Sequence, residues 1–97
     1  MEIKNTAIAG TLESSDIQIM LSQGNNGIEI ELESEVKAKF GAQINAVITE
    51  TLKQYEIENA KVKAVDKGAL DCVIKARTIT VAQRALGIAD QPAWEVF

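Results

Sequence analysis

Residues 16–33 read DIQIMLSQGNNGIEIELE, and this stretch decides the expected fold. Ile17, Ile19 and Leu21 share one face of an extended segment over 16–22, and the apolar residues of 28–33 alternate with glutamates. Such alternation is typical of strands with one buried face. The Gly and Asn residues of 23–27 tolerate the positive φ of a tight reversal. We therefore predict that the two strands form a hairpin.

After Ser34 the apolar period changes from two residues to about 3.6, which predicts a long amphipathic helix. Ser34 is a suitable N-cap, and Glu35 would lie favourably at the positive end of the helix dipole. The predicted apolar stripe consists of Val36, Phe40, Ile44, Val47, Ile48, Leu52 and Tyr55.

The second half of the chain follows the same plan. Residues 60–66 read as a strand, 66–68 as a turn and 69–77 as another strand. Leu70, Cys72, Ile74 and Ala76 alternate along that last strand, which makes Cys72 a core thiol. Thr78 would then cap a final helix that Gly87 ends, although the β-branched run 78–81 also suits a continued strand.

The predicted class is α+β, with two strand-strand-helix units that form an antiparallel sheet covered on one face by helices. Residues 1–97 make one domain, in which 1–15 are an extended lead and 88–97 an aromatic tail. Trp94 and Phe97 in this tail dock on a partner or pack on their own sheet. The glutamates of 28–33 either pair with bases on later strands or are solvated; these bases are Lys61, Lys63, Lys75 and Arg77.

Composition limits the chemistry that this chain can perform alone. It has 97 residues, 46% of them hydrophobic, with one Cys and no His. A chain of this length buries a single core. Without an imidazole, Ser-His and Cys-His catalytic pairs and the usual zinc sites are excluded. We therefore do not expect an enzyme that acts alone.

The charge and the hydropathy of the chain limit the kinds of partner and the cellular location that we expect. Residues 1–36 hold seven acids and one lysine, a net charge of −6 within an overall −4. This negative charge argues against a nucleic-acid partner, because binding of the phosphates requires clustered Lys and Arg side chains. No apolar run is long enough to span a membrane, and the first residues lack the features of a signal peptide. The free thiol agrees with a cytoplasmic protein.

The tetrad Glu13-Ser14-Ser15-Asp16 has the composition of an exposed turn. From the residues alone, its serines merely form a turn or cap. Three segments, one of which contains the tetrad, carry a resemblance to a known family: AGTLESSD at 9–16, FGA at 40–42 and DKGALDCV at 66–73. Together with the length and acidic balance, they resemble the acyl carrier (gamma) subunit of citrate lyase over nearly the whole chain.

The resemblance implies that Ser14 carries a phosphoribosyl-dephospho-coenzyme A group through a phosphodiester. Glu13, Ser15 and Asp16 would form the supporting attachment turn, although residue chemistry alone does not separate Ser14 from Ser15. Glu13 and Asp16 either bind the loading enzyme or a metal that it uses, or are solvated turn acids. The resemblance implies no catalytic residue and no metal ligand in this chain.

The implied function is to hold acetyl and citryl thioesters while citrate is cleaved to acetate and oxaloacetate. The implied partners are an alpha subunit that transfers acyl groups, a beta subunit that cleaves citryl thioester, and the loading enzyme. Two alternatives remain open: the carrier subunit of malonate decarboxylase, and a non-carrier interaction module with an acidic N-terminal face.

Overall fold

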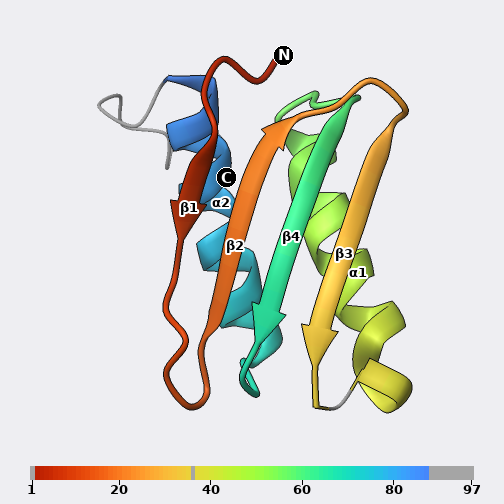
Figure 1. The fold of residues 1–97 in the computed structure, drawn as a ribbon, viewed down its shortest axis with the longest axis vertical. Coiled ribbons are helices and arrows are strands. Elements are labelled where there is room, and N and C mark those ends of the chain that lie inside the picture. The colour runs from red at the N-terminus through yellow and green to blue at the C-terminus, as the bar shows by residue number, and fades with distance from the viewer. Residues whose placement is uncertain (1, 36, 88–97) are drawn as a thin grey trace.

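Six elements make up the part of the chain that the computed structural model describes, residues 2–35 and 37–87 (Figure 1). In chain order they are β1 (Ala7–Ala9), β2 (Ile17–Gln23), β3 (Ile28–Ser34), α1 (Lys37–Gln54), β4 (Ala60–Asp66) and α2 (Asp71–Leu86). The aromatic tail, with Trp94 and Phe97, lies outside the described residues, so its docking stays a prediction. No helix in the described ranges is long and apolar enough to cross a membrane.

The four strands form one mixed sheet in the order β1-β2-β4-β3. β2 pairs antiparallel with β1 and β4, whereas β3 and β4 are parallel. The predicted hairpin between β2 and β3 is therefore wrong, and so is the fully antiparallel sheet. The start of β4 lies between the two strands: the Ala60 amide donates to the Gly27 carbonyl at 3.0 Å, and the Gly27 amide donates to Asn59 Oδ1 at 2.9 Å.

β3, α1 and β4 form the crossover that a parallel strand pair requires. α1 begins at Lys37, later than predicted. Ser34, the predicted N-cap, is instead the last residue of β3. Glu35 also precedes the helix, and the first turn of α1 contains no acidic residue. Most of the predicted stripe is buried, namely Ile44, Ile48, Leu52 and Tyr55. Phe40 is 42% exposed and Val47 is half-buried, while Val36 is not among the described residues.

The predicted strand over 69–77 is wrong, because residues 71–86 form the single helix α2. Its buried residues have helical spacing and are Ile74, Thr78, Val81, Ala82, Ala85 and Leu86. Cys72 is exposed, so its expected place in the core is also wrong. Thr78 does not cap a helix; it lies within α2, and its hydroxyl donates to the Ile74 carbonyl at 2.7 Å. Gly87 ends the helix at φ 74°, as predicted.

Both helices pack on the same face of the sheet, which confirms the predicted α+β class with one covered face (Figure 1). Ile17, Ile19 and Leu21 are fully buried on the covered side, as their alternation predicted. On the open side Glu29 lies opposite Lys61 and Glu31 opposite Lys63. The register thus aligns opposite charges in these two pairs, but no ion pair forms between them in the described part of the chain, which favours the solvated alternative. Lys75 and Arg77 lie on α2 rather than on a strand.

Candidate functional site

The loop over residues 10–16 connects β1 to β2 at the end of the molecule where β3 and β4 finish (Figure 1). It is the turn expected from the sequence, and Ser14 and Ser15 are both exposed. The Asp16 amide donates to the Glu13 carbonyl at 3.2 Å and closes the turn. Ser15 takes a positive φ of 66°. In the part of the chain that the structure describes, neither serine hydroxyl has a hydrogen-bond partner.

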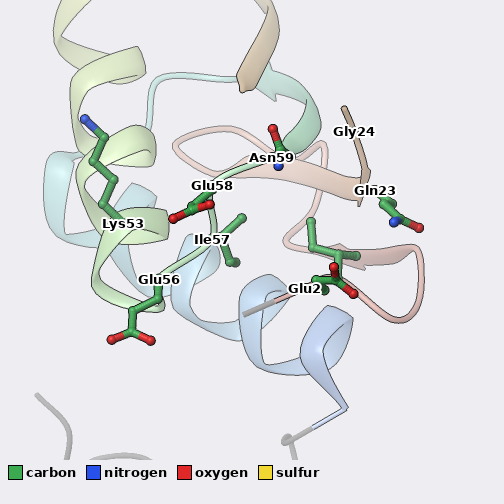
Figure 2. A pocket seen from close by; sticks show the side chains of 9 residues that line it. Glu2, Gln23, Gly24, Lys53, Glu56, Ile57, Glu58 and Asn59 are labelled. Atoms are coloured by element: carbon green, nitrogen blue, oxygen red, sulfur yellow. The ribbon is translucent and has the colours of Figure 1, made fainter. Parts of the chain in front are cut away.

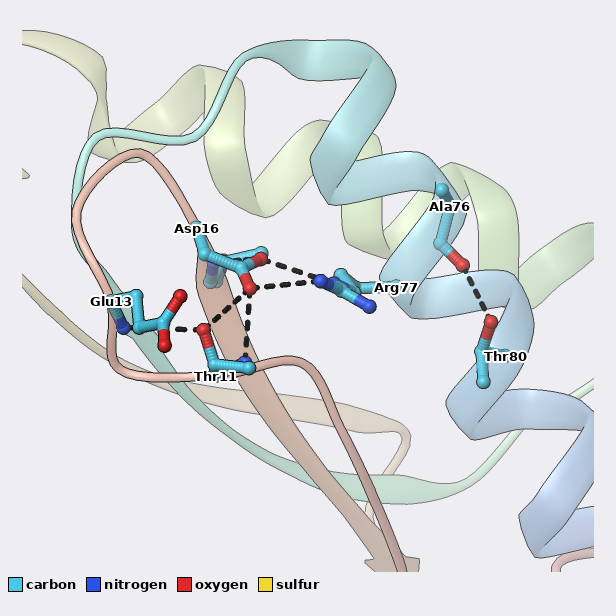
Figure 3. A network of polar contacts seen from close by, with 7 residues as sticks. Thr11, Glu13, Asp16, Ala76, Arg77 and Thr80 are labelled. Carbon is cyan, nitrogen blue, oxygen red and sulfur yellow. Dashed lines mark hydrogen bonds and ion pairs between the residues drawn. The ribbon is translucent and has the colours of Figure 1, made fainter.

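The Asp16 carboxylate holds this loop together (Figure 3). Oδ2 accepts hydrogen bonds from the Thr11 hydroxyl at 2.7 Å and the Thr11 amide at 3.2 Å, while Oδ1 accepts from the Ile17 amide at 2.7 Å. Arg77 on α2 donates from Nε to Oδ1 at 3.0 Å and from Nη2 to Oδ2 at 2.8 Å. This bidentate ion pair fixes the loop to the helix layer.

These donors also change the ionisation of the pair. The Arg77 hydrogen bonds, followed by those from Thr11 and Ile17, hold the pKa of the Asp16 carboxyl well below its usual range. The same contact raises the pKa of Arg77. Asp16 therefore stays ionised in the folded protein at any ordinary pH. The sequence pattern indicated Arg77 as a possible partner of the strand glutamates but missed its contact with Asp16, because the two residues are 61 positions apart and no local pattern relates them.

The loop is also paired with the turn that follows β4. The Ser15 amide donates to the Lys67 carbonyl, and the Lys67 amide donates to the Asp16 carbonyl, both at 2.8 Å. These bonds continue the β2–β4 ladder beyond its last strand pair, Ile17 with Asp66. Ser14 comes directly before this paired backbone, so its hydroxyl is presented to solvent from a fixed base.

Gly10 allows the chain to turn sharply as it leaves β1. Its φ is 89°, and a Cβ atom at this position would lie 1.8 Å from the carbonyl oxygen of Ile17. A side chain other than hydrogen would push the loop away from the start of β2. The path that brings Thr11 back to Asp16 therefore depends on glycine.

A hollow of about 610 Å³ lies at the other end of the sheet, where β2 ends and β4 begins (Figure 2). Its rim is mainly polar and includes Glu2, Glu56, Glu58 and Lys53. A smaller hollow of about 400 Å³ lies on the open face of the sheet, and Leu12 of the serine loop and Lys67 contribute to its lining. Of these two hollows, the smaller one thus borders the serine loop, through Leu12.

Comparison with known proteins first gives the class. A family model described as ACP, the malonate decarboxylase delta subunit, matches residues 4–85. A crystal structure of a Pseudomonas malonate decarboxylase hetero-tetramer in complex with malonate contains a chain of the same fold, with a TM-score of 0.74 at 16% identity over 88% of each chain. The family match thus gives the class of this chain, a small acyl carrier subunit, and the structural match shows the shared fold.

The particular family follows from close relatives. Citrate lyase acyl carrier proteins of Lactobacillus helveticus, Lactiplantibacillus plantarum and Oenococcus oeni are 74%, 73% and 69% identical over the full length of both chains. The chain belongs to the citrate lyase acyl carrier protein family. Its function is that of an acyl carrier, which works with a prosthetic group and with enzyme partners in a complex.

Proposed function

We propose that Ser14 is the attachment residue and that its Oγ forms a phosphodiester with a phosphoribosyl-dephospho-coenzyme A group. The observation that carries this proposal is the pairing of an exposed, unpartnered hydroxyl with a rigid base: Ser14 is exposed, whereas Asp16 receives five hydrogen bonds. A loading enzyme requires such a hydroxyl, because its oxygen must approach the phosphorus of an activated donor, lose its proton and displace the leaving group.

The surroundings of Ser14 fit an anionic attachment. The neighbouring turn supplies Lys67, whose carbonyl is bonded to the Ser15 amide. The charge of Arg77 is already matched by Asp16, whereas Lys67 has no ion-pair partner among the described residues and can face an anionic group. When bound, the group supplies a thiol that carries the acetyl or citryl unit as a thioester.

We assign the neighbours of Ser14 positioning roles. Asp16 holds the loop to α2, and its two oxygens are occupied by protein donors, which supports a structural role over metal binding. Ser15 supplies the backbone contact to Lys67. The Glu13 carboxylate has no partner among residues 2–35 and 37–87 and is exposed, so it is available to the loading enzyme.

The proposed partners are the alpha subunit, which exchanges acetyl for citryl, the beta subunit, which cleaves the citryl thioester, and the loading enzyme. The flexible arm keeps its thiol at a high local concentration near both active sites, so that transfer becomes effectively intramolecular. On the sequence grounds given above, we place this complex in the cytoplasm. The names of the close relatives favour citrate lyase over malonate decarboxylase as the complex that it serves.

The test is the intact mass of the protein after co-expression with the loading enzymes. The wild-type chain should gain one nucleotide-containing adduct on the peptide with Ser14, and Ser14→Ala should gain none. Ser15→Gly is the matched control, because glycine accepts the positive φ at this position without strain; it should still be loaded. An adduct on Ser14→Ala would refute the assignment, and an unmodified wild-type chain would favour the interaction module.

A further inference from the structure

The hollow that Leu12 of the serine loop helps to line is a groove with a mainly apolar floor on the open face of the sheet. Ile8, Met20 and Lys63 are consecutive in register across β1, β2 and β4, and Val65 lies two residues further along β4. Ile8 is 50% exposed, and Leu12, from the serine loop, is 55% exposed. These side chains present apolar surface to water in a groove that begins at the loop of Ser14.

Two lysines give this groove an anion-binding side. Lys63 and Lys67 both line it, and the ion pair between Arg77 and Asp16 is the one found within the described ranges. Neither lysine therefore has a carboxylate within 4.0 Å there. The backbone of Lys67 is fixed on both sides by its bonds to Ser15 and Asp16, which holds the base of its side chain beside the loop.

A negative charge on the far side of the groove determines which side favours an anion. Glu33 lines the opposite rim on β3, where it lies across from Val65. Its carboxylate repels an anion from the β3 side, so the favourable position for phosphate is the side nearest Lys67 and the serine loop. An anionic chain that starts at Ser14 thus meets its cations first and the apolar floor next.

We propose that this groove is the resting site of the prosthetic arm, with the diphosphate of the nucleotide held by Lys63 and Lys67. The adenine ring and the pantetheine chain then lie over Ile8, Leu12 and Met20. This inference rests on the proposed attachment at Ser14. Because the arm is tethered, its effective concentration at the groove is on the order of millimolar, so a weak site is enough to fill it and still release the thiol to a partner.

Methyl NMR of the full chain tests this site without any measurement of activity. Spectra are compared between protein expressed without the loading enzymes and protein whose intact mass shows complete loading. Loading should shift the methyl signals of Ile8, Leu12 and Met20. Leu70 is the internal control, because it is 70% exposed and follows Lys67 closely in the chain but does not line the groove; its signals should not move.

Charge variants test the assigned cations. Lys63→Gln combined with Lys67→Gln should abolish most of the shift at Met20, whereas Lys61→Gln is the matched control on the same strand and should retain it. Salt at about 1 M, where the Debye length falls to about 3 Å, should reduce the shifts in the wild type in the same way. Shifts that persist in the double variant would overturn the role of the two lysines.

A titration with free ligand distinguishes an error in the proposed groove from an error in the proposed attachment at Ser14. Free dephospho-coenzyme A is added to unloaded wild type and to Ser14→Ala, and the methyl signals of the same three residues should shift in both. Loaded protein in which the methyl signals of Ile8, Leu12 and Met20 stay where they are in unloaded protein would show a solvated arm and refute the groove. Shifts at Ile8 and Met20 that appear only with the lyase or transferase subunit would make this face a protein interface and also refute the proposal.

Discussion

Replacement of Gly10 by alanine tests whether the serine loop depends on its close approach to β2. The new Cβ would lie 1.8 Å from the Ile17 carbonyl oxygen, and this separation has to grow by about 1.2 Å to reach the 3.0 Å that real contacts respect. The left-handed φ of 89° adds about 1–2 kcal/mol for a residue with a side chain. Relief of this overlap shifts the start of β2, where the Asp16 carbonyl accepts from the Lys67 amide, and weakening of that hydrogen bond would cost about 0.5–1.5 kcal/mol. We expect a loss of roughly 2–4 kcal/mol in the free energy of unfolding.

Gly27→Ala is the matched control for this substitution. Gly27 also has a positive φ, 78°, but a Cβ there would meet nothing within 4 Å. It comes directly before β3, which starts at the end of the sheet opposite the serine loop (Figure 1). Its cost should be the conformational strain alone, about 1–2 kcal/mol. Urea unfolding followed by circular dichroism gives both values, and the slope with urea should be the same for both variants if only stability has changed.

The two variants should also differ in function. Gly10→Ala moves the loop that presents Ser14, so its initial rate of loading should fall well below that of Gly27→Ala when adduct formation is followed by mass spectrometry. Equal stabilities and equal loading rates for the two variants would refute the argument that the close approach at Gly10 shapes the loop.

Three further substitutions test the ion pair, the core and the sheet. Asp16→Asn should lower stability at neutral pH; because the folded-state pKa of Asp16 is lowered, this contribution is complete above the unfolded value of about 3.9 and is lost as pH falls through the folded pKa. The urea midpoints of variant and wild type should therefore converge only in strong acid, and a constant difference down to pH 2 would contradict this. Ile48→Ala, at a fully buried position of α1, should cost about 2–5 kcal/mol, whereas Phe40→Ala, 42% exposed, should cost clearly less in the same urea assay. Glu31→Lys places a like charge opposite Lys63 and should destabilise the sheet by about 0.2–1 kcal/mol, a loss that high salt should reduce; an unchanged midpoint at low salt would show that this pair is simply solvated.

Local sequence pattern determined the strands and the long helix of this protein. Alternation over 17–21 placed three apolar residues on one face, and all three are fully buried. The 3.6-residue period after Ser34 gave α1, and Gly87 marked the end of α2. The polar tetrad at 13–16 predicted an exposed turn, since short side chains with local hydrogen-bonding groups favour that structure. These features depend on neighbours in the chain, which a sequence displays directly.

Competition between local and tertiary preferences decided α2. The alternation of Leu70, Cys72 and Ile74 favoured a strand, yet Leu70 and Cys72 are exposed and only Ile74 is buried. The helical spacing of the buried residues from Ile74 to Leu86 allows the helix to cover β1 and β2. Packing of this face outweighed the β-branched run at 78–81, because intrinsic propensity differs by less than about 1 kcal/mol per residue.

The partners of each strand and the geometry of the serine loop were decided only by the tertiary structure. The Gly- and Asn-rich stretch at 23–27 suits a hairpin, but the four residues between β2 and β3, 24–27, also span the roughly 10 Å needed to pass over one intervening strand. β4 takes that central place with buried Ala60, Val62 and Ala64, and it satisfies the backbone of both neighbours. The loop of Ser14 likewise owes its fixed shape to Arg77, a residue 61 positions away. The sequence determined that the turn with Ser14 and Ser15 is exposed. The tertiary structure brought Arg77 to this turn, because only folding brings residues so far apart in the chain into hydrogen-bonding distance.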